Sequence, residues 1–364
     1  MKHDIRVMSS NYMQWAKNNV QVKYNLAVSG VPNYPLSALP VRIEDLEITG
    51  DSYYGYEPLQ QVIARKYGVS TNQIFSTLGT SLANHIAIAV TVQPGDDIII
   101  EQPTYELLIS TARYLGANVH RFPRHFDNGF QIDPDDVRKS ITSKTKLIVL
   151  TNLHNPSSAF TDEKTLEEIG SIAERIGARV LVDEVYLDAA FDLNPLSSIH
   201  LGNNFIVTNS LTKVYGLSGL RCGWVIAQPE LIQKMWHLND LFEVIPPHIS
   251  ELLSVLAFNN LDKIISLTRN LLHANHRTLN DFLKTRLDLD YVQPGFGTVL
   301  FPRLKNGKVD EILEILINKY ETAIVPGKYF EMPNHLRIGL SCKPDIFQIG
   351  IKNIEKALYD LTRL

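Results

Sequence analysis

The chain has 364 residues, of which 45% are hydrophobic and 20% are charged, and its formal net charge is −4. This composition is typical of a globular protein with a large apolar core, and the length predicts two domains. The weakly acidic balance indicates neither a nucleic-acid partner nor an acidic membrane surface, and two cysteines without metal-ligand spacing, Cys222 and Cys342, indicate neither a disulfide scaffold nor a metal site.

The amino-terminal residues contain no long apolar run, so we expect no signal peptide, no transmembrane helix and a cytoplasmic location. Farther along, short apolar runs alternate with helical patterns. Continuous apolar strands between helices predict a largely parallel sheet that is buried on both faces, and hence an α/β domain. The expected strands cover residues 97–101, 146–150, 179–182, 204–208 and 223–227, and the expected helices cover residues 105–115 and 161–176.

The pattern changes after residues 245–247, where the sequence Ile-Pro-Pro precedes long helical segments at residues 251–258 and 263–287. A change of this kind indicates a second domain. We therefore predict a large α/β domain over residues 46–246, and a smaller α+β domain made of residues 1–45 and 247–364.

Four of the apolar runs end in polar or reactive residues. Ligands of open α/β sheets bind outside the carboxyl ends of the parallel strands, so these residues are expected to converge on one cleft. A lysine amine forms an imine, and a carboxylate holds a pyridinium nitrogen, so the combination suits a Schiff-base cofactor. The four strand ends lie at residues 103–105, 152–156, 183–186 and 209–213.

The sequence S-L-T-K-V-Y-G-L-S-G-L-R-C-G at residues 210–223 resembles the lysine box of the class I/II aminotransferases, which are fold-type I enzymes of the aspartate aminotransferase superfamily. The resemblance covers nearly the whole chain. It implies a mostly parallel central sheet in the large domain, and pyridoxal 5'-phosphate as the cofactor. It also implies that Lys213 binds the cofactor as a Schiff base and moves the substrate proton, while Ser210 and Arg221 bind the phosphate.

Two further motifs resemble the family's sequence around the cofactor ring. In V-D-E-V-Y, the resemblance implies that Asp183 pairs with the ring nitrogen and that Tyr186 donates to the phenolic oxygen of the ring. In N-L-H-N-P, it implies that Asn155 reaches the same oxygen on the substrate side of the ring. The family usually continues with a small residue and a glycine, whereas this chain has Ser157 and Ser158. Because glycine is favoured at positive φ, we expect this turn to differ locally.

A phosphate cradle is predicted where Gly79, Thr80 and Ser81 open an apolar helix, because the first N–H groups of a helix have no partner within it. The resemblance assigns these residues to the cofactor phosphate. It also places Tyr105, in P-T-Y, where the family stacks an aromatic ring on the pyridine.

The resemblance extends to the substrate and to a second subunit. Arg337, in H-L-R-I-G, resembles the arginine that pairs with the substrate α-carboxylate, a role that suits the planar guanidinium. Gly30, in V-S-G-V-P, corresponds to a glycine near the same carboxylate. Tyr53, or Tyr54 if the alignment slips by one residue, matches a tyrosine that reaches the partner subunit's phosphate. A homodimer with shared active sites is therefore expected.

These motifs predict an aminotransferase that moves the α-amino group of an amino acid to a 2-oxo acid. Other pyridoxal-phosphate reactions on the same fold stay open, namely β-elimination as in C–S lyases, racemisation, or a cyclisation of the aminocyclopropane type. A non-catalytic sensor that binds the cofactor is a further alternative, against which intact Lys213, Asp183 and Arg221 argue. A cofactor-free Schiff-base aldolase would leave the phosphate-binding set unexplained. The sequence identifies neither the amino donor nor the acceptor.

Overall fold

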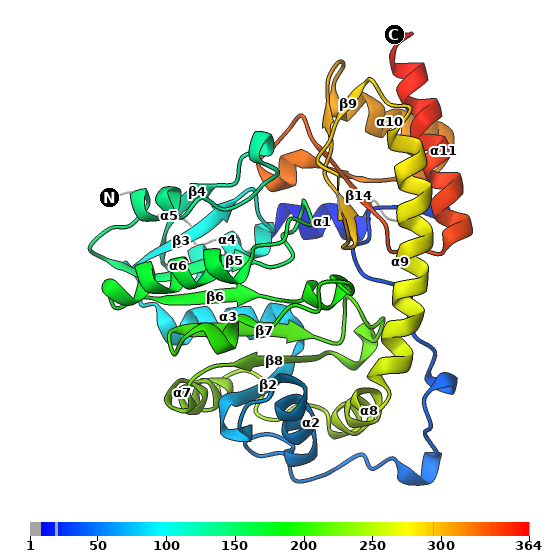
Figure 1. The fold of residues 1–364 in the computed structure, drawn as a ribbon. Coiled ribbons are helices and arrows are strands. Elements are labelled where there is room, and N and C mark those ends of the chain that lie inside the picture. Colours follow the sequence, from blue (N-terminus) through cyan, green and yellow to red (C-terminus); the bar gives the residue numbers. More distant parts are fainter. Residues whose placement is uncertain (1–8, 19–20, 294, 364) are drawn as a thin grey trace.

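The computed structural model describes residues 9–18, 21–293 and 295–363. Its centre is a seven-stranded sheet in the order β2-β8-β7-β6-β5-β3-β4 (Figure 1). All of these strands run parallel except β8, which is antiparallel to both of its neighbours. The strands are β2 (Ile74–Leu78), β3 (Asp97–Gln102), β4 (Asn118–Pro123), β5 (Thr145–Thr151), β6 (Arg179–Asp183), β7 (Phe205–Ser210) and β8 (Cys222–Ile226).

Helices cover both faces of this sheet. Successive side chains of a strand point to opposite faces, so Ile98 and Ile100 of β3 pack in one hydrophobic cluster and Ile99 packs in another. The first cluster also contains residues of α3, α4 and α7, and the second contains residues of α5 and α6. The helices around the sheet are α2 (Glu57–Tyr67), α3 (Gly79–Thr91), α4 (Glu106–Tyr114), α5 (Pro134–Lys139), α6 (Glu163–Arg175), α7 (Pro229–Asn239) and α8 (His248–Phe258).

The predicted α/β class with a mainly parallel sheet is confirmed, and five expected strands appear as β3, β5, β6, β7 and β8. The prediction missed β2 and β4. Strand β4 lies at the sheet edge and its sequence N-V-H-R-F-P is largely polar, so it carries little apolar signal. The last long helix was expected to reach residue 287, but α9 ends at Leu283, and Leu287 is exposed to solvent.

The carboxy-terminal part carries α9 (Leu261–Leu283), α10 (Val309–Tyr320) and α11 (Pro344–Leu361), beside three small sheets. The amino-terminal segment joins it, because β1 pairs in parallel with β12 and α1 lies next to β14 in Figure 1. One hydrophobic cluster contains residues on both sides of residue 246, so the two parts share a core, and the division at 45/46 and 246/247 stays a prediction. The remaining elements are α1 (Asn11–Asn18), β1 (Tyr24–Asn25), β9 (Leu289–Asp290), β10 (Val299–Leu300), β11 (Arg303–Leu304), β12 (Thr322–Ala323), β13 (Val325–Pro326) and β14 (Leu336–Gly339).

The direction of β8 brings distant segments of the chain together. Because β8 runs against its neighbours, its first residues lie at the edge where the parallel strands end. Ser210 at the end of β7 is paired with Gly223, and Leu78 at the end of β2 is paired with Cys222. The start of α3, the start of β8 and the end of β7 therefore meet at one sheet edge. Within the described ranges, no helix has the length and apolar character needed to cross a bilayer.

Candidate active site

A cavity of about 390 Å³ opens at the carboxyl edge of the parallel strands, between the sheet and the segment that carries α1 and β14. This volume is in the range of small-molecule sites. Most residues that the sequence singled out line it together. They are Thr80, Ser81, Tyr105, Asn155, Asp183, Tyr186, Ser210, Lys213, Arg221 and Arg337.

Lys213 follows β7 and is half-buried, and it lines the cavity wall. Its Nζ donates a hydrogen bond to the Ser29 hydroxyl at 3.3 Å. Burial lowers the pKa of the amine, and the nearby guanidinium groups of Arg337 and Arg221 also lower it, because each disfavours a second positive charge. A lysine in this setting is shifted towards the neutral, nucleophilic form.

Asp183 is the last residue of β6 and is 5% exposed. Its Oδ2 accepts a hydrogen bond from the Asn84 amide at 2.8 Å, and its Oδ1 accepts one from the Val185 backbone at 3.1 Å. Burial raises the pKa of this carboxyl to about 6, although these hydrogen bonds and the charge of Lys213 act in the opposite direction. The Asn84 amide is fixed in turn, because its oxygen accepts from Thr208 at 2.6 Å.

The start of α3 forms a cradle that fits an anion. Gly79 has φ +80°, and a Cβ at this position would lie 2.5 Å from Nη2 of Arg221. The helix begins without a side-chain cap and has no acidic residue in its first turn. The hydroxyl of Thr80 is buried without a partner among the described residues, and Ser81 and Ser210 line the cavity nearby. Free N–H groups, hydroxyls and a guanidinium are the donor set of a phosphate site.

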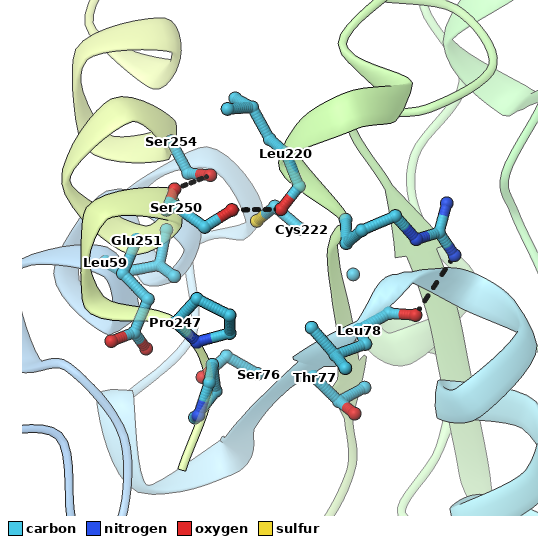
Figure 2. A pocket seen from close by; sticks show the side chains of 13 residues that line it. Leu59, Ser76, Thr77, Leu78, Leu220, Cys222, Pro247, Ser250, Glu251 and Ser254 are labelled. Carbon is cyan, nitrogen blue, oxygen red and sulfur yellow. Dashed lines mark hydrogen bonds between the residues drawn. The ribbon is translucent and has the colours of Figure 1, made fainter. Parts of the chain in front are cut away.

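Helix α8 binds the residue that precedes Arg221. Arg221 has φ +51°, a conformation that residues with a side chain rarely adopt. Its Nη2 donates to the Leu78 carbonyl at 3.2 Å. Figure 2 shows the small hollow beside it, where Ser250 donates to the carbonyl of Leu220 and Ser254 donates to the carbonyl of Ser250. These contacts tie the residue before Arg221 to α8 and fix the arginine at the cradle.

Arg337 of β14 is 1% exposed and closes the opposite side of the cavity. Its Nη1 donates to Asn155 at 3.0 Å, and its Nη2 donates to the Tyr12 hydroxyl at 3.1 Å and to the Ala27 carbonyl at 2.7 Å. Its Nε is buried and has no partner among the described residues. An orphaned donor on a fixed guanidinium fits a carboxylate ligand.

Aromatic side chains line the mouth of the cavity beside Arg337. Tyr105 stands at the start of α4, and its ring meets that of Tyr12 edge to face at 5.5 Å between centroids. The Tyr105 hydroxyl donates to the Met13 sulfur at 3.5 Å. Helix α1 therefore adds Tyr12, Met13 and Trp15 to the cavity wall, next to the tyrosine that the sequence placed against the cofactor ring.

The turn after Asn155 keeps a positive φ without a glycine, so its predicted local difference from the family stays a prediction. Ser158 adopts φ +61°, the region usually left to glycine, and its hydroxyl donates to the Val299 carbonyl at 2.8 Å. His154 is fully buried and bonds to the Ser157 hydroxyl and the Pro103 carbonyl, at 2.6 and 2.9 Å. Burial holds its pKa well below the usual value. His154 therefore fills the turn beside Asn155.

Three predicted residues lie outside the cavity lining. Gly79 lies at the phosphate cradle, next to the Arg221 guanidinium. Gly30 lies beside Lys213, since a Cβ on Gly30 would be 3.4 Å from Cδ of the lysine. Tyr53 is 73% exposed in the single chain, and Tyr54 is 56% exposed with its ring edge against Trp236. The assignment of Tyr53 or Tyr54 to a partner's site stays a prediction.

The sequence analysis missed Ser29, Asn84 and Tyr12. Asn84 lies one turn into α3, beyond the three residues that open the helix and carry the phosphate motif. Ser29 directly precedes Gly30, which was singled out, and Tyr12 lies in a short helix with no motif of its own. Each acts on a residue far away in the chain, so only the fold shows the contact.

The chain matches the family model of aminotransferase class I and II over residues 45–354. It therefore belongs to this family, whose cofactor is pyridoxal phosphate.

A curated relative, the capreomycidine synthase of Streptomyces vinaceus, is 28% identical over 93% of this chain and 90% of its own length. The aspartate aminotransferase of Sulfolobus acidocaldarius is 24% identical over 86% of this chain and 83% of its own. A solved structure of a PLP-dependent aminotransferase from Streptococcus suis superposes with a TM-score of 0.93, at 25% identity, over 98% of this chain and 99% of that one. The fold-type I architecture expected from the sequence is thereby confirmed.

Proposed function

We propose that this protein is an aminotransferase that moves the α-amino group of an amino acid to a 2-oxo acid, with Lys213 as the residue that binds the cofactor. One observation carries the proposal: the Lys213 amine, the Asp183 carboxylate and the Arg337 guanidinium line one cavity together with a phosphate cradle. The aspartate aminotransferases among the relatives support it.

The residues present fit pyridoxal phosphate. When bound, this cofactor supplies an aldehyde carbon that joins an amine, and a ring that accepts an electron pair from the substrate carbon. In our proposal, Asp183 holds the ring nitrogen in its protonated form, and Tyr186 and Asn155 hold the phenolic oxygen. Tyr105 packs against the ring. The phosphate is held by Gly79, Thr80, Ser81, Ser210 and Arg221.

Lys213 moves the proton in this proposal. The amine accepts the α-proton of the substrate only when it is neutral, and burial together with two guanidinium groups favours that form. Arg337 holds the substrate carboxylate and so sets the distance between the α-carbon and Nζ. Gly30 lies directly beside the lysine, because a Cβ at this position would be in van der Waals contact with Cδ of Lys213 at 3.4 Å.

A second candidate is another reaction of the same cofactor, and the relative named capreomycidine synthase favours it. All such reactions begin at the same α-carbon and use the same lysine, so the residues that line the cavity serve them equally. What separates them is the fate of the amino group. Transamination removes it from the substrate, whereas a cyclisation leaves the cofactor in its aldehyde form.

The test is a single-turnover reaction of the cofactor-loaded protein with a panel of amino acids, each without an acceptor. Transamination leaves pyridoxamine phosphate and a 2-oxo acid in equal amounts. Ammonia with an unchanged cofactor indicates elimination. A new ring product with an unchanged cofactor indicates cyclisation. Either of the last two results, without pyridoxamine phosphate from any amino acid, overturns the aminotransferase assignment.

We propose in addition that two chains form a homodimer with shared active sites. Exposed apolar side chains gather in two segments, residues 36–54 and 241–249, including Ile43, Ile48 and Leu241 at 85%, 82% and 78% exposure. The two segments are neighbours, since Ser52 bonds to Glu251 at 2.6 Å close by. A large exposed apolar surface of this kind marks a protein interface. A cytoplasmic location stays a prediction of the sequence.

The dimer is tested with two variants, Lys213→Ala and Tyr53→Ala, which are unfolded and refolded together. In a mixed dimer one site receives Lys213 from one chain and Tyr53 from the other, so activity exceeds that of either variant alone. If Tyr53 acts within its own chain, every site stays defective and no activity returns. Recovery with Tyr54→Ala in place of Tyr53→Ala would assign the role to the neighbouring residue.

A further inference from the structure

Ser29 touches two of the proposed catalytic groups at once. Its hydroxyl accepts a hydrogen bond from Nζ of Lys213 at 3.3 Å and shares another with the Tyr186 hydroxyl at 2.8 Å. Ser29 is 4% exposed, and the three side chains line the same cavity. A hydroxyl carries one donor and two acceptor positions, so it can serve both neighbours at the same time.

The backbone around Ser29 is fixed from both sides. Val31 donates to the carbonyl of Lys213 itself at 2.9 Å, which ties this segment to the lysine loop. On the other side, the Leu26 carbonyl accepts from Gly339 at 2.7 Å, and the Ala27 carbonyl accepts from Arg337 at 2.7 Å. Ser29 is therefore held between the lysine loop and the strand that carries Arg337. These contacts hold the backbone of Ser29 beside the lysine, and the bond to the Tyr186 hydroxyl orients its side chain.

We propose that Ser29 is a positioning residue that holds the amine of Lys213 whenever that amine is free of the cofactor. This inference rests on the proposed function, because it assigns a role to the lysine during turnover. The lysine amine is free whenever it does not bind the cofactor. In that form the Nζ–Ser29 bond keeps the amine at the cavity wall and limits its rotation. The free amine then stays close to the substrate carbon held by Arg337.

Ser29 also affects the charge that the amine carries. A hydroxyl oxygen that accepts from Nζ favours the ammonium form, so its removal lowers the lysine pKa. The other charged or titratable groups that act on this amine are Tyr12 of α1, Asp183 of β6, Arg221 before β8 and Arg337 of β14. Among the described residues Ser29 has no hydrogen bond to any of these groups, but it bonds to Tyr186, and Ser29→Ala removes that bond as well. A lysine pKa that returns to the wild-type value in Ser29→Thr therefore assigns the shift to the Ser29 hydroxyl.

The experiment compares Ser29→Ala with Ser29→Thr, which keeps the hydroxyl, and with Ser341→Ala as a matched control. Ser341 is also a buried serine and donates to the Thr298 carbonyl at 3.4 Å, but it does not line this cavity. The first readout needs no cofactor. The rate at which acetic anhydride modifies Lys213 is measured against pH, by mass spectrometry of the peptide that contains it. Melting temperatures check that all variants fold.

Ser29→Ala is expected to lower the pKa of Lys213 by about one pH unit, the size of a hydrogen bond to a charged group. In the cofactor-loaded protein we expect kcat to fall by about tenfold with little change in KM, because the base loses its position but the substrate keeps its carboxylate partner. Ser29→Thr and Ser341→Ala should keep both values near those of the wild type.

An unchanged lysine pKa and an unchanged kcat in Ser29→Ala overturn the inference. So does a threonine variant that behaves like the alanine variant, or a control variant that shows the same losses. The proposed function fails in a different way. If borohydride fixes the cofactor to another lysine, the aminotransferase assignment of Lys213 is wrong, whatever the acetylation profile shows.

Discussion

Asn84 orients the carboxylate on which the proposed electron sink depends. Its amide donates to Oδ2 of Asp183 at 2.8 Å, in a site where the carboxyl is 5% exposed. The change Asn84→Ala removes this bond and leaves Asp183 with the backbone N–H of Val185 at 3.1 Å as its remaining hydrogen-bond donor among the described residues. The ionised form of Asp183 then loses stabilisation, while its burial is unchanged.

The expected change in the pKa of Asp183 follows from the hydrogen bond that is lost. A hydrogen bond to a charged group contributes about 1.5–3 kcal/mol, which corresponds to about one to two pH units. The pKa of Asp183 is raised to about 6 by burial. In Asn84→Ala it should therefore rise to about 7–8. The protonated acid cannot pair with a protonated ring nitrogen. At pH 7 the ionised fraction of Asp183 then falls by about 2- to 10-fold, and cofactor affinity should fall by the same factor.

The assay is a titration of cofactor-free protein with pyridoxal phosphate, followed by absorbance at several pH values. In the wild type the affinity should weaken as pH falls through about 6, and in the variant this decline should begin about one to two pH units higher. Thr208→Val is the control, since it removes the bond of 2.6 Å that holds the Asn84 oxygen but keeps the amide that faces Asp183.

The reasoning is refuted if Asn84→Ala binds the cofactor as the wild type does at every pH. A second check uses Asp183→Asn. If Asn84 acts through the charge of Asp183, adding Asn84→Ala to that variant should lower the cofactor affinity little further, because the two changes remove the same interaction. Additive losses of affinity in the double variant would show that Asn84 acts elsewhere.

Three further predictions concern the cradle, the carboxylate arginine and a buried histidine. Gly79→Ala places a methyl group against the guanidinium of Arg221 at a residue with φ +80°, so phosphate-ester affinity measured by calorimetry should fall while the aldehyde pyridoxal, which lacks the phosphate, binds as before. Arg337→Lys loses the planar guanidinium, and kcat/KM should fall by about 10- to 100-fold. The loss should be equal for all amino acids, because the α-carboxylate is common to them. A loss confined to one substrate would contradict the assignment. Burial lowers the pKa of His335 to about 4, so the folded protein resists its protonation, and stability should be lost as pH falls from about 6.5 through 4. In His335→Phe, unfolding by urea should show a smaller loss over that window, and an identical loss would mean that other groups cause it.

Much of the site was predictable from the sequence because its residues follow buried parallel strands. Asp183 comes directly after an apolar run, Asn155 and Lys213 each follow one within five residues, and the ends of parallel strands share one edge. The position of Arg221 depends instead on the direction of β8. It reaches this edge because β8 is antiparallel, which no periodicity in its five residues indicates.

The site residues that were not predicted take part in contacts between distant parts of the chain. Ser29 meets Tyr186 across 157 positions of sequence, and Arg337 meets Tyr12 across 325. No local pattern encodes such a pair, because each residue type is common and the contact exists only in the folded chain. Strand β4 was missed for a different reason, since an edge strand needs few apolar residues.

The central claim is that Lys213 carries the cofactor, and borohydride reduction of the loaded protein tests it most directly. Reduction fixes an imine permanently to its lysine, and the modified residue is then identified by mass spectrometry of the peptides. The account predicts a single modified peptide that contains Lys213, with no fixed cofactor in Lys213→Ala. A modified peptide from any other lysine, with the Lys213 peptide unmodified, would contradict it.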